Sequence, residues 1–182
     1  MSDIPEKDLL ELLRSDDSFN YGFNLLVRKY QQQVYWQVRR MVIIHEDADD
    51  LVQEIFVKIW KNIDSFRGKS KLTTWIYRIA VNETISFLKS KRNRLFLPLV
   101  DYEKQLAQSL KDDRYFSGDT IQLYLQKALL RLPEKQRLVF NLRYYSELQY
   151  DEISEITGTS VGALKASYHH AVKKIEKYLS EN

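Results

Sequence analysis

The sequence contains no cysteine, and it has only five glycines and three prolines in 182 residues. The absence of cysteine excludes disulfides, thiol nucleophiles and thiolate zinc sites, and it is typical of a chain in a reducing compartment. No stretch approaches the roughly 18 uninterrupted apolar residues that a membrane helix needs, and the N-terminus lacks a basic and apolar signal segment. We therefore expect a cytoplasmic protein without membrane insertion.

The chain also has little excess of either charge, since its net charge is only +3. The charged residues are, however, distributed unevenly along the sequence. Residues 64–94 contain eight Lys and Arg against two acidic residues, whereas residues 45–54 contain five acidic residues and no Lys or Arg. A basic segment of this kind favours a polyanion as its partner. The acidic segment directly precedes it, so we expect the two segments to bind different partners.

Apolar residues recur at spacings of three and four along most of the chain, which predicts an all-α fold. The pattern indicates a short helix near residues 9–13, a long one over 23–41, a third from about 47 to 63, and a fourth that starts at 72 and ends at 89. The periodicity collapses after residue 94, around Pro98 and Gly118. We therefore predict two small helical domains, 1–94 and 121–182, joined by an irregular linker over 95–120.

Residues 150–164 combine three features of a tight helix-turn-helix. Ser154 is small where two helices cross, Gly158 can adopt the positive φ of the turn, and Ser160 suits the N-cap of the second helix. The second helix is expected to bury Leu164, Tyr168, Ala171, Ile175 and Leu179.

The opposite face of that second helix is small, polar or basic, as in helices that enter a DNA major groove. The residues predicted to contact duplex DNA are Ser160, Gly162, Ala163, Lys165, Ala166, Ser167, His169, His170 and Lys173. An ordinary helical hairpin with a solvated basic face is the alternative, because surface lysines alone do not indicate DNA binding.

Aromatic residues alternate with cations in the basic segment, a combination that suits single-stranded nucleic acid. Cations follow the backbone of the strand, while aromatic or polar pockets take unstacked bases. The residues predicted to bind a strand are Phe66, Arg67, Lys69, Lys71, Arg78 and Asn82. Trp75 and Tyr77 have a competing interpretation as core residues, which we prefer for Trp75 because it lies in the apolar stripe.

Two other classes of function compete with DNA binding. An enzyme would use His45, Glu46, Asp47, Asp49 and Asp50 as a metal site, but adjacent acids in the first turn of a helix point in different directions. The sequence has no phosphate-binding glycine loop, HExxH run or nucleophile elbow, so we expect no catalytic residues, metal or cofactor. A repressor or activator whose N-terminal domain senses a ligand would explain the helix-turn-helix but neither the acidic nor the basic segment.

Several motifs resemble bacterial sigma factors of the extracytoplasmic-function (ECF) group of the sigma-70 family. Region 2 of that group is similar to residues 47–56, 66–68 and 74–82, which read DADDLVQEIF, FRG and TWIYRIAVN. Region 4 is similar to residues 132–137, LPEKQR, and to the helix-turn-helix. The motifs occur in the family's order and cover about 23–94 and 121–179.

The resemblance implies a transcription initiation factor that binds core RNA polymerase and directs it to promoters. It implies that the β′ clamp helices contact Asp47, Asp50, Leu51, Gln53 and Glu54. It also implies that the loop over 66–71 and the helix through Asn82 capture a flipped base of the melted minus-ten element. The second helix of region 4 would read the minus-thirty-five duplex, and region 4 would rest on the β flap. An anti-sigma protein that masks these surfaces is expected, since many relatives have one.

The chain departs from the family pattern at two places. Ser167, His169 and His170 stand where many members carry arginines, so the preferred upstream sequence does not transfer from those members. Gln149 stands where a serine often caps the first helix of the pair, which predicts a weaker cap.

Overall fold

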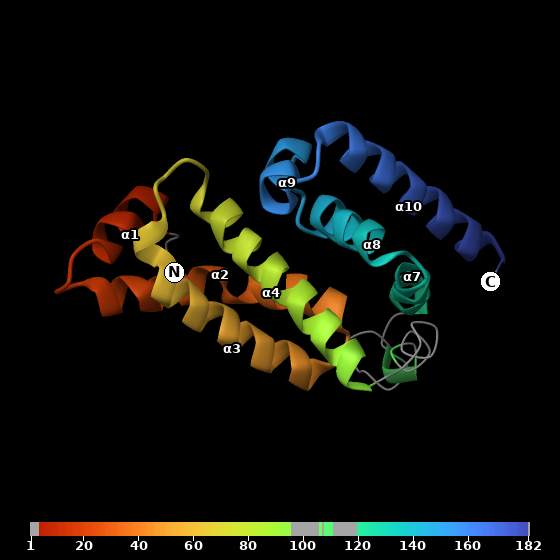
Figure 1. Cartoon of the computed structure of the whole chain (residues 1–182), viewed down its shortest axis with the longest axis horizontal. Helices are drawn as coiled ribbons and strands as arrows, with labels where there is room; N and C mark the ends of the chain where they lie inside the picture. Colours follow the sequence, from red (N-terminus) through yellow and green to blue (C-terminus); the bar gives the residue numbers. More distant parts are fainter. Residues whose placement is uncertain (1–3, 96–105, 107, 111–119, 182) are drawn as a thin grey trace.

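The computed structural model describes residues 4–95, 106, 108–110 and 120–181 (Figure 1). Its N-terminal half consists of α1 (Glu6–Leu13), α2 (Phe19–Val42), α3 (His45–Asn62), the 3-10 turn η1 (Ile63–Ser65) and α4 (Leu72–Leu95). Its C-terminal half consists of α7 (Thr120–Leu130), α8 (Glu134–Phe140), the π-helical segment η2 (Asn141–Tyr145), α9 (Tyr150–Thr157) and α10 (Val161–Glu181). The described residues contain no strand, and the predicted all-α fold is confirmed.

The N-terminal half is a bundle in which α2, α3 and α4 pack against one another and α1 lies across the start of α2 (Figure 1). Its core is built from the apolar stripes of the sequence, including Leu26, Val38, Leu51, Ile55 and Ile76, all of which are buried. The close approach of α1 to α2 requires Gly22, because a Cβ there would lie 2.9 Å from the Cβ of Leu12.

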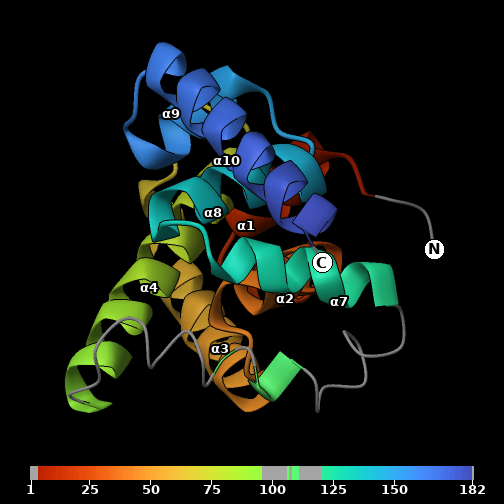
Figure 2. The same ribbon diagram turned by 90° about the vertical axis from the view of Figure 1, so that its right-hand side faces the viewer.

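The C-terminal half packs α8 and α9 under α10, with α7 at the far end of α10 (Figure 2). Phe140 stacks on Tyr168 with ring centroids 5.7 Å apart, and Ala171 and Ile175 complete this core. No helix among the described residues is both long and apolar enough to cross a membrane.

The two halves share one hydrophobic core. Residues of the C-terminal half, including Leu142, Ile153 and Ile156, belong to the same buried cluster as the apolar residues of α2, α3 and α4. Helix α4 runs beside α9, and α2 touches η2. The structure therefore places the helix-turn-helix directly against the basic segment.

Element boundaries differ from the predicted ones where long-range partners extend a helix. Helix α4 continues to Leu95 rather than ending at Lys89, and in this extension Lys91 pairs with Asp47 and Arg92 lies 3.8 Å from Glu134. Helix α3 begins at His45, so Asp50 lies beyond its first turn.

Three of the exposed apolar residues lie in stripes that the periodicity places on buried faces. Trp60, Ile121 and Leu179 are 41%, 76% and 42% exposed. Trp60 nonetheless packs edge-to-face against Phe19 and Phe23, with ring centroids 4.7 Å apart in each pair.

The predicted linker falls largely outside the described residues. Of the residues described within it, 106 and 108–110 are helical, and Leu106 and Leu110 are buried against Ile43 and Leu130. These two leucines attach the segment to both halves of the molecule.

Candidate nucleic-acid and polymerase interfaces

The turn of the helix-turn-helix has the predicted geometry. Gly158 ends α9 in the left-handed conformation, with φ 69° and ψ 15°, and its N–H donates to the Ser154 carbonyl at 2.8 Å. The hydroxyl of Ser160 accepts from the Ala163 N–H at 3.4 Å, which makes Ser160 the N-cap of α10. The predicted weakness at Gln149 is compensated by Glu152, whose Oε2 accepts the Gln149 N–H at 2.9 Å.

The outward face of α10 is open to solvent. Of the residues predicted to read duplex DNA, only Ser167 is half-buried, and the others are exposed. The inward prediction is confirmed for Leu164, Ala171 and Ile175, which are buried, whereas Tyr168 is half-buried and the prediction is wrong for Leu179, which is 42% exposed. The N-terminal part of α10 therefore presents small and polar groups beside Lys165 and Lys173.

Residues 66–71, here called the basic loop, connect η1 to α4 and turn at Gly68, whose φ is 68°. Phe66 is buried and its ring lies 5.6 Å from the ring of Trp75, while Arg67, Lys69 and Lys71 are exposed. Asn82 lies further along α4 and is also exposed. The basic loop, Arg78 and Asn82 together are called the strand site below.

A pocket of about 370 Å³ lies between the basic loop and α4. Phe66, Arg67, Trp75 and Arg78 line it, together with Glu155 from α9. Trp75 is half-buried and lines this pocket as well as packing on the core, so the interpretation as a core residue describes only one side of its ring. Tyr77, by contrast, is buried as a core residue.

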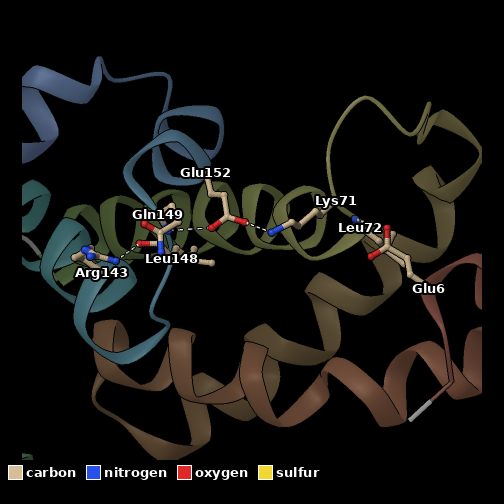
Figure 3. A network of polar contacts seen from close by, with 7 residues as sticks. All are labelled: Glu6, Lys71, Leu72, Arg143, Leu148, Gln149 and Glu152. Atoms are coloured by element: carbon tan, nitrogen blue, oxygen red, sulfur yellow. Dashed lines mark hydrogen bonds and ion pairs between the residues drawn. The ribbon is translucent and has the colours of Figure 1, made fainter.

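Two cations of the strand site are bound by α9, and Figure 3 shows one of them, Lys71, beside Glu152. The Nζ of Lys71 lies 2.8 Å from Oε1 of Glu152, and the Nε of Arg78 donates to the Glu155 carbonyl at 3.0 Å. The hydrogen bond between Lys71 and Glu152 raises the pKa of the lysine and lowers the pKa of the glutamate. On the other side of the basic loop, Oε1 of Glu6 accepts the Leu72 N–H at 3.0 Å and satisfies the first turn of α4.

The predicted polymerase contacts lie on α3. Asp50, Gln53 and Glu54 are exposed and line an open groove of about 650 Å³, whereas Asp47 is half-buried in its ion pair with Lys91. Leu51 is only 2% exposed, so its side chain packs in the core and is not on this acidic face. The described residues contain no group of three or more His, Cys, Asp or Glu placed to hold a metal.

Sequence reasoning missed Glu152 and Glu155 as partners of the strand site. Glu152 lies in the first turn of α9, where the helix dipole is a sufficient local explanation for an acidic residue. The pairing with Lys71 and Arg78 spans 81 and 77 positions, and no local pattern in the sequence indicates it. Complementarity of charge is a signal for Lys71 and Glu152 alone, because Arg78 binds the backbone carbonyl of Glu155.

Comparison with known proteins identifies the family. Residues 26–94 match the family described as Sigma-70 region 2, and residues 122–175 match the family described as Sigma-70, region 4. The chain belongs to the sigma-70 family. It is a sigma factor of the ECF group, a transcription initiation factor that acts with RNA polymerase at specific promoters.

Curated relatives match this sigma factor over nearly its whole length. The ECF RNA polymerase sigma factor SigW of Bacillus subtilis is 31% identical over 168 residues, which cover 88% of this chain and 90% of SigW. The RNA polymerase sigma-H factor of Pseudomonas aeruginosa is 30% identical, with coverage of 96% and 93%. The ECF RNA polymerase sigma-E factor of Escherichia coli K12 is also 30% identical, with coverage of 95% and 93%.

Two solved structures share the fold. CnrH, solved in complex with the cytosolic domain of CnrY, superposes with a TM-score of 0.71 at 20% identity and covers 97% of this chain and 98% of its own. The sigma factor RpoE of Bartonella quintana, solved with the anti-sigma factor NepR, gives a TM-score of 0.68 at 23% identity, with coverage of 87% and 96%. The N-terminal half, most of which matches region 2, and the C-terminal half, most of which matches region 4, are called region 2 and region 4 below.

Proposed function

We propose that this sigma factor reads its promoters in two parts. The exposed face of α10 reads the minus-thirty-five element as duplex. The strand site of region 2 captures the minus-ten element as a melted single strand. The acidic face of α3, formed by Asp47, Asp50, Gln53 and Glu54, docks on the β′ clamp helices, and region 4 rests on the β flap. Promoter recognition takes place in the cytoplasm, and the polymerase carries out RNA synthesis.

The observation that carries the proposal is the pocket between the basic loop and α4. A volume of about 370 Å³ is ample for one unstacked base, and the rings of Phe66 and Trp75 offer apolar surface for its face. Arg67 and Arg78 stand at the same pocket to pair with the neighbouring phosphates. A duplex does not fit such a site, because its bases are already stacked and paired.

Run-off transcription with core polymerase tests the function as a whole. The purified chain should convert core enzyme into one that starts at discrete promoters in a pool of genomic fragments. The two rival classes predict other results, since a repressor or activator changes transcription by an already complete holoenzyme and an enzyme needs no polymerase. No promoter-dependent transcript from any fragment would overturn the proposal.

The substitution Asn82→Ala distinguishes binding of the melted minus-ten strand from binding of the minus-thirty-five duplex. The substitution removes an exposed amide from the strand site without touching α10, so promoter opening should fall more than duplex binding. Permanganate reactivity of unpaired thymines measures opening, and retardation of a closed promoter complex measures duplex binding. An equal loss in both assays would contradict the assignment of Asn82 to the strand.

An anti-sigma partner is part of the proposal. Both structural neighbours were solved in complexes, CnrH with the cytosolic domain of CnrY and RpoE with the anti-sigma factor NepR. The fold of this chain matches theirs over 97% and 87% of its length, which supports an anti-sigma partner for this chain. Co-purification of the tagged chain from its own cells, followed by mass spectrometry, is the direct measurement.

A further inference from the structure

Helix α10 lies along an outer edge of the molecule, and the side chains on its exposed face increase in size along the helix (Figure 1). The first positions at the centre of this face carry at most a methyl group: Gly162, Ala163 and Ala166. His169 and His170 follow, while Lys165 lies to the side, with its Nζ 5.8 Å from the centre of the Tyr150 ring. A helix with such a small leading end can approach a duplex closely, which brings the two imidazoles within reach of it.

The two imidazoles diverge from one another. Consecutive residues of an α-helix project about 100° apart, and the ring centroids of His169 and His170 lie 6.0 Å apart with planes tilted by 55°. Lys173 follows one turn later, at the i+4 position of His169 and the i+3 position of His170. These three residues are called the imidazole cluster below. Within the part of the chain that the structure describes, neither imidazole forms a hydrogen bond or an ion pair, so both are open to a ligand.

The imidazole cluster has basic neighbours and lacks an acidic partner. On α10 the nearest charged residues are Lys165 and Lys174, and Lys174 donates to Oε1 of Gln136 at 3.1 Å. Four elements packed against or next to α10 carry charged side chains, and among the described residues none of these forms a hydrogen bond or ion pair with either imidazole: Lys127 and Arg131 of α7, Glu134, Lys135 and Arg137 of α8, Arg143 of η2, and Asp151, Glu152 and Glu155 of α9. The described part of the free chain therefore offers a protonated imidazole of this cluster no carboxylate as a partner.

Protonation changes what the imidazole cluster can bind. A neutral imidazole has one donor and one acceptor, whereas an imidazolium has two donors and a positive charge. Histidine changes between these forms between about pH 5 and pH 8, an interval in which lysine keeps its charge. The acceptors that a helix meets on duplex DNA are phosphate oxygens and, in the major groove, N7 and O6 of guanine. The duplex thus supplies the acceptors that the free chain lacks.

We propose that α10 binds duplex DNA with uptake of protons: His169 and His170 become imidazoliums on the duplex and donate to its acceptor atoms on either side of Lys173. The inference rests on the proposed function, because it requires α10 to be the duplex reader. Because the bound form carries more protons than the free form, affinity rises as the pH falls from about 8 to about 6. Arginine at either position would bind without this pH dependence.

Fluorescence anisotropy with the full chain and a labelled pool of random duplexes of about 20 base pairs tests the pH dependence. The Kd at pH 6 should be about fivefold to twentyfold lower than at pH 8, since a charge-assisted hydrogen bond is roughly twice as strong as a neutral one. His45→Gln is the matched control and should keep the full pH effect. His45 is the third histidine of the chain and lies on α3, where it contacts Tyr35 and Asp49.

Two double variants separate the charge of the imidazoles from their shape. His169→Gln with His170→Gln keeps polar side chains that take up no proton, so its Kd should change less than about twofold between the two pH values. His169→Lys with His170→Lys carries both charges permanently and should bind at pH 8 about as tightly as the wild type does at pH 6. The single variant His170→Gln should keep about half of the pH effect on a logarithmic scale, which provides the same test if a double variant fails to fold.

Two further measurements identify the protons and the acceptor. Isothermal titration calorimetry at pH 7 in buffers of different ionisation enthalpy counts the protons, and the wild type should take up a net amount that the double glutamine variant does not. Each phosphate that a protein neutralises changes the slope of log K against log salt by about −0.9. A steeper slope at pH 6 than at pH 8 assigns the imidazoliums to phosphates, whereas equal slopes with the pH effect retained assign them to guanine edges.

The outcomes distinguish proton uptake from the proposed function. Equal wild-type affinities at the two pH values, or a pH effect that persists in the double glutamine variant, would overturn proton uptake while run-off transcription still succeeds. Loss of the pH effect in His45→Gln would also refute it, because the proton would then be taken up on α3. Failure of the wild type in run-off transcription would overturn the proposed function, and absence of duplex binding at both pH values would overturn the assignment of α10 as the duplex reader.

Discussion

Gly22→Ala is the sharpest test of how α1 is held on region 2. A methyl group at this position would lie 2.9 Å from Leu12 Cβ, 3.1 Å from Leu12 C and 3.2 Å from Leu13 N. Carbon atoms in contact normally lie about 3.5–4.0 Å apart, so α1 has to move outward by about 0.5–1 Å. Two of the three crowded atoms are backbone atoms, which no change of rotamer can relieve.

Two opposing effects set the size of the change. Alanine in a helix interior is more stable than glycine by about 0.5–1 kcal/mol. Overpacking costs about 1–3 kcal/mol, because α1 is anchored by the buried Leu9 and Leu13 and by the Lys29 hydrogen bond to the Ile4 carbonyl at 2.7 Å. We therefore expect a net loss of about 1 kcal/mol of unfolding free energy.

Urea unfolding followed by circular dichroism measures this loss, which corresponds to a fall of about 2–4 °C in Tm for a chain of this size. Gly162→Ala is the matched control, because Gly162 lies in α10 and a methyl group added there would have nothing within 4 Å. The control should be stabilised by up to about 0.5 kcal/mol. If Gly22→Ala were stabilised as much as Gly162→Ala, the reasoning about the contact between α1 and α2 would be refuted.

Two further predictions concern region 4. Gly158→Ala places a Cβ in the left-handed conformation of the turn and should cost about 1–2 kcal/mol in urea unfolding, although nothing lies within 4 Å; no loss would show that the turn adopts another conformation. Burial raises the pKa of Tyr145 to about 12, so the stability tied to its neutral form is complete below about pH 10 and is lost as the pH rises through 12. Between about pH 10 and 12, the unfolding free energy of Tyr145→Phe should therefore fall less than that of the wild type. Equal falls in the two proteins would contradict the burial of the Tyr145 hydroxyl.

The helices and the turn were predictable from the sequence because their causes are local. The apolar spacing of residues 23–41 dictates α2, and Gly158 and Ser160 dictate the turn and the start of α10. The exposure of the predicted α10 contacts follows from the same periodicity. The assignment of these residues to duplex DNA remains a prediction.

Other features depend on which segments meet, and the sequence alone does not determine that. The extension of α4 past Lys89 is supported by Asp47 and Glu134, which lie far away in the sequence. The π-helical segment η2 places Tyr145 under Arg40 of α2, a contact that no periodicity indicates. The burial of Leu51 was predictable from its apolar stripe, whereas its assignment to the polymerase surface came from the family resemblance.

The chemistry of α10 limits what the minus-thirty-five reader can do by itself. Helix α10 has no arginine, and arginine makes the commonest bidentate contact to guanine in a major groove. Its outer face offers the imidazoles of His169 and His170, together with Lys165 and Lys173, which suit phosphates. The two ring nitrogens of an imidazole point in different directions, so each histidine gives a base edge a single hydrogen bond rather than the paired bonds of a guanidinium. We therefore expect much of the promoter discrimination to come from the proposed strand site.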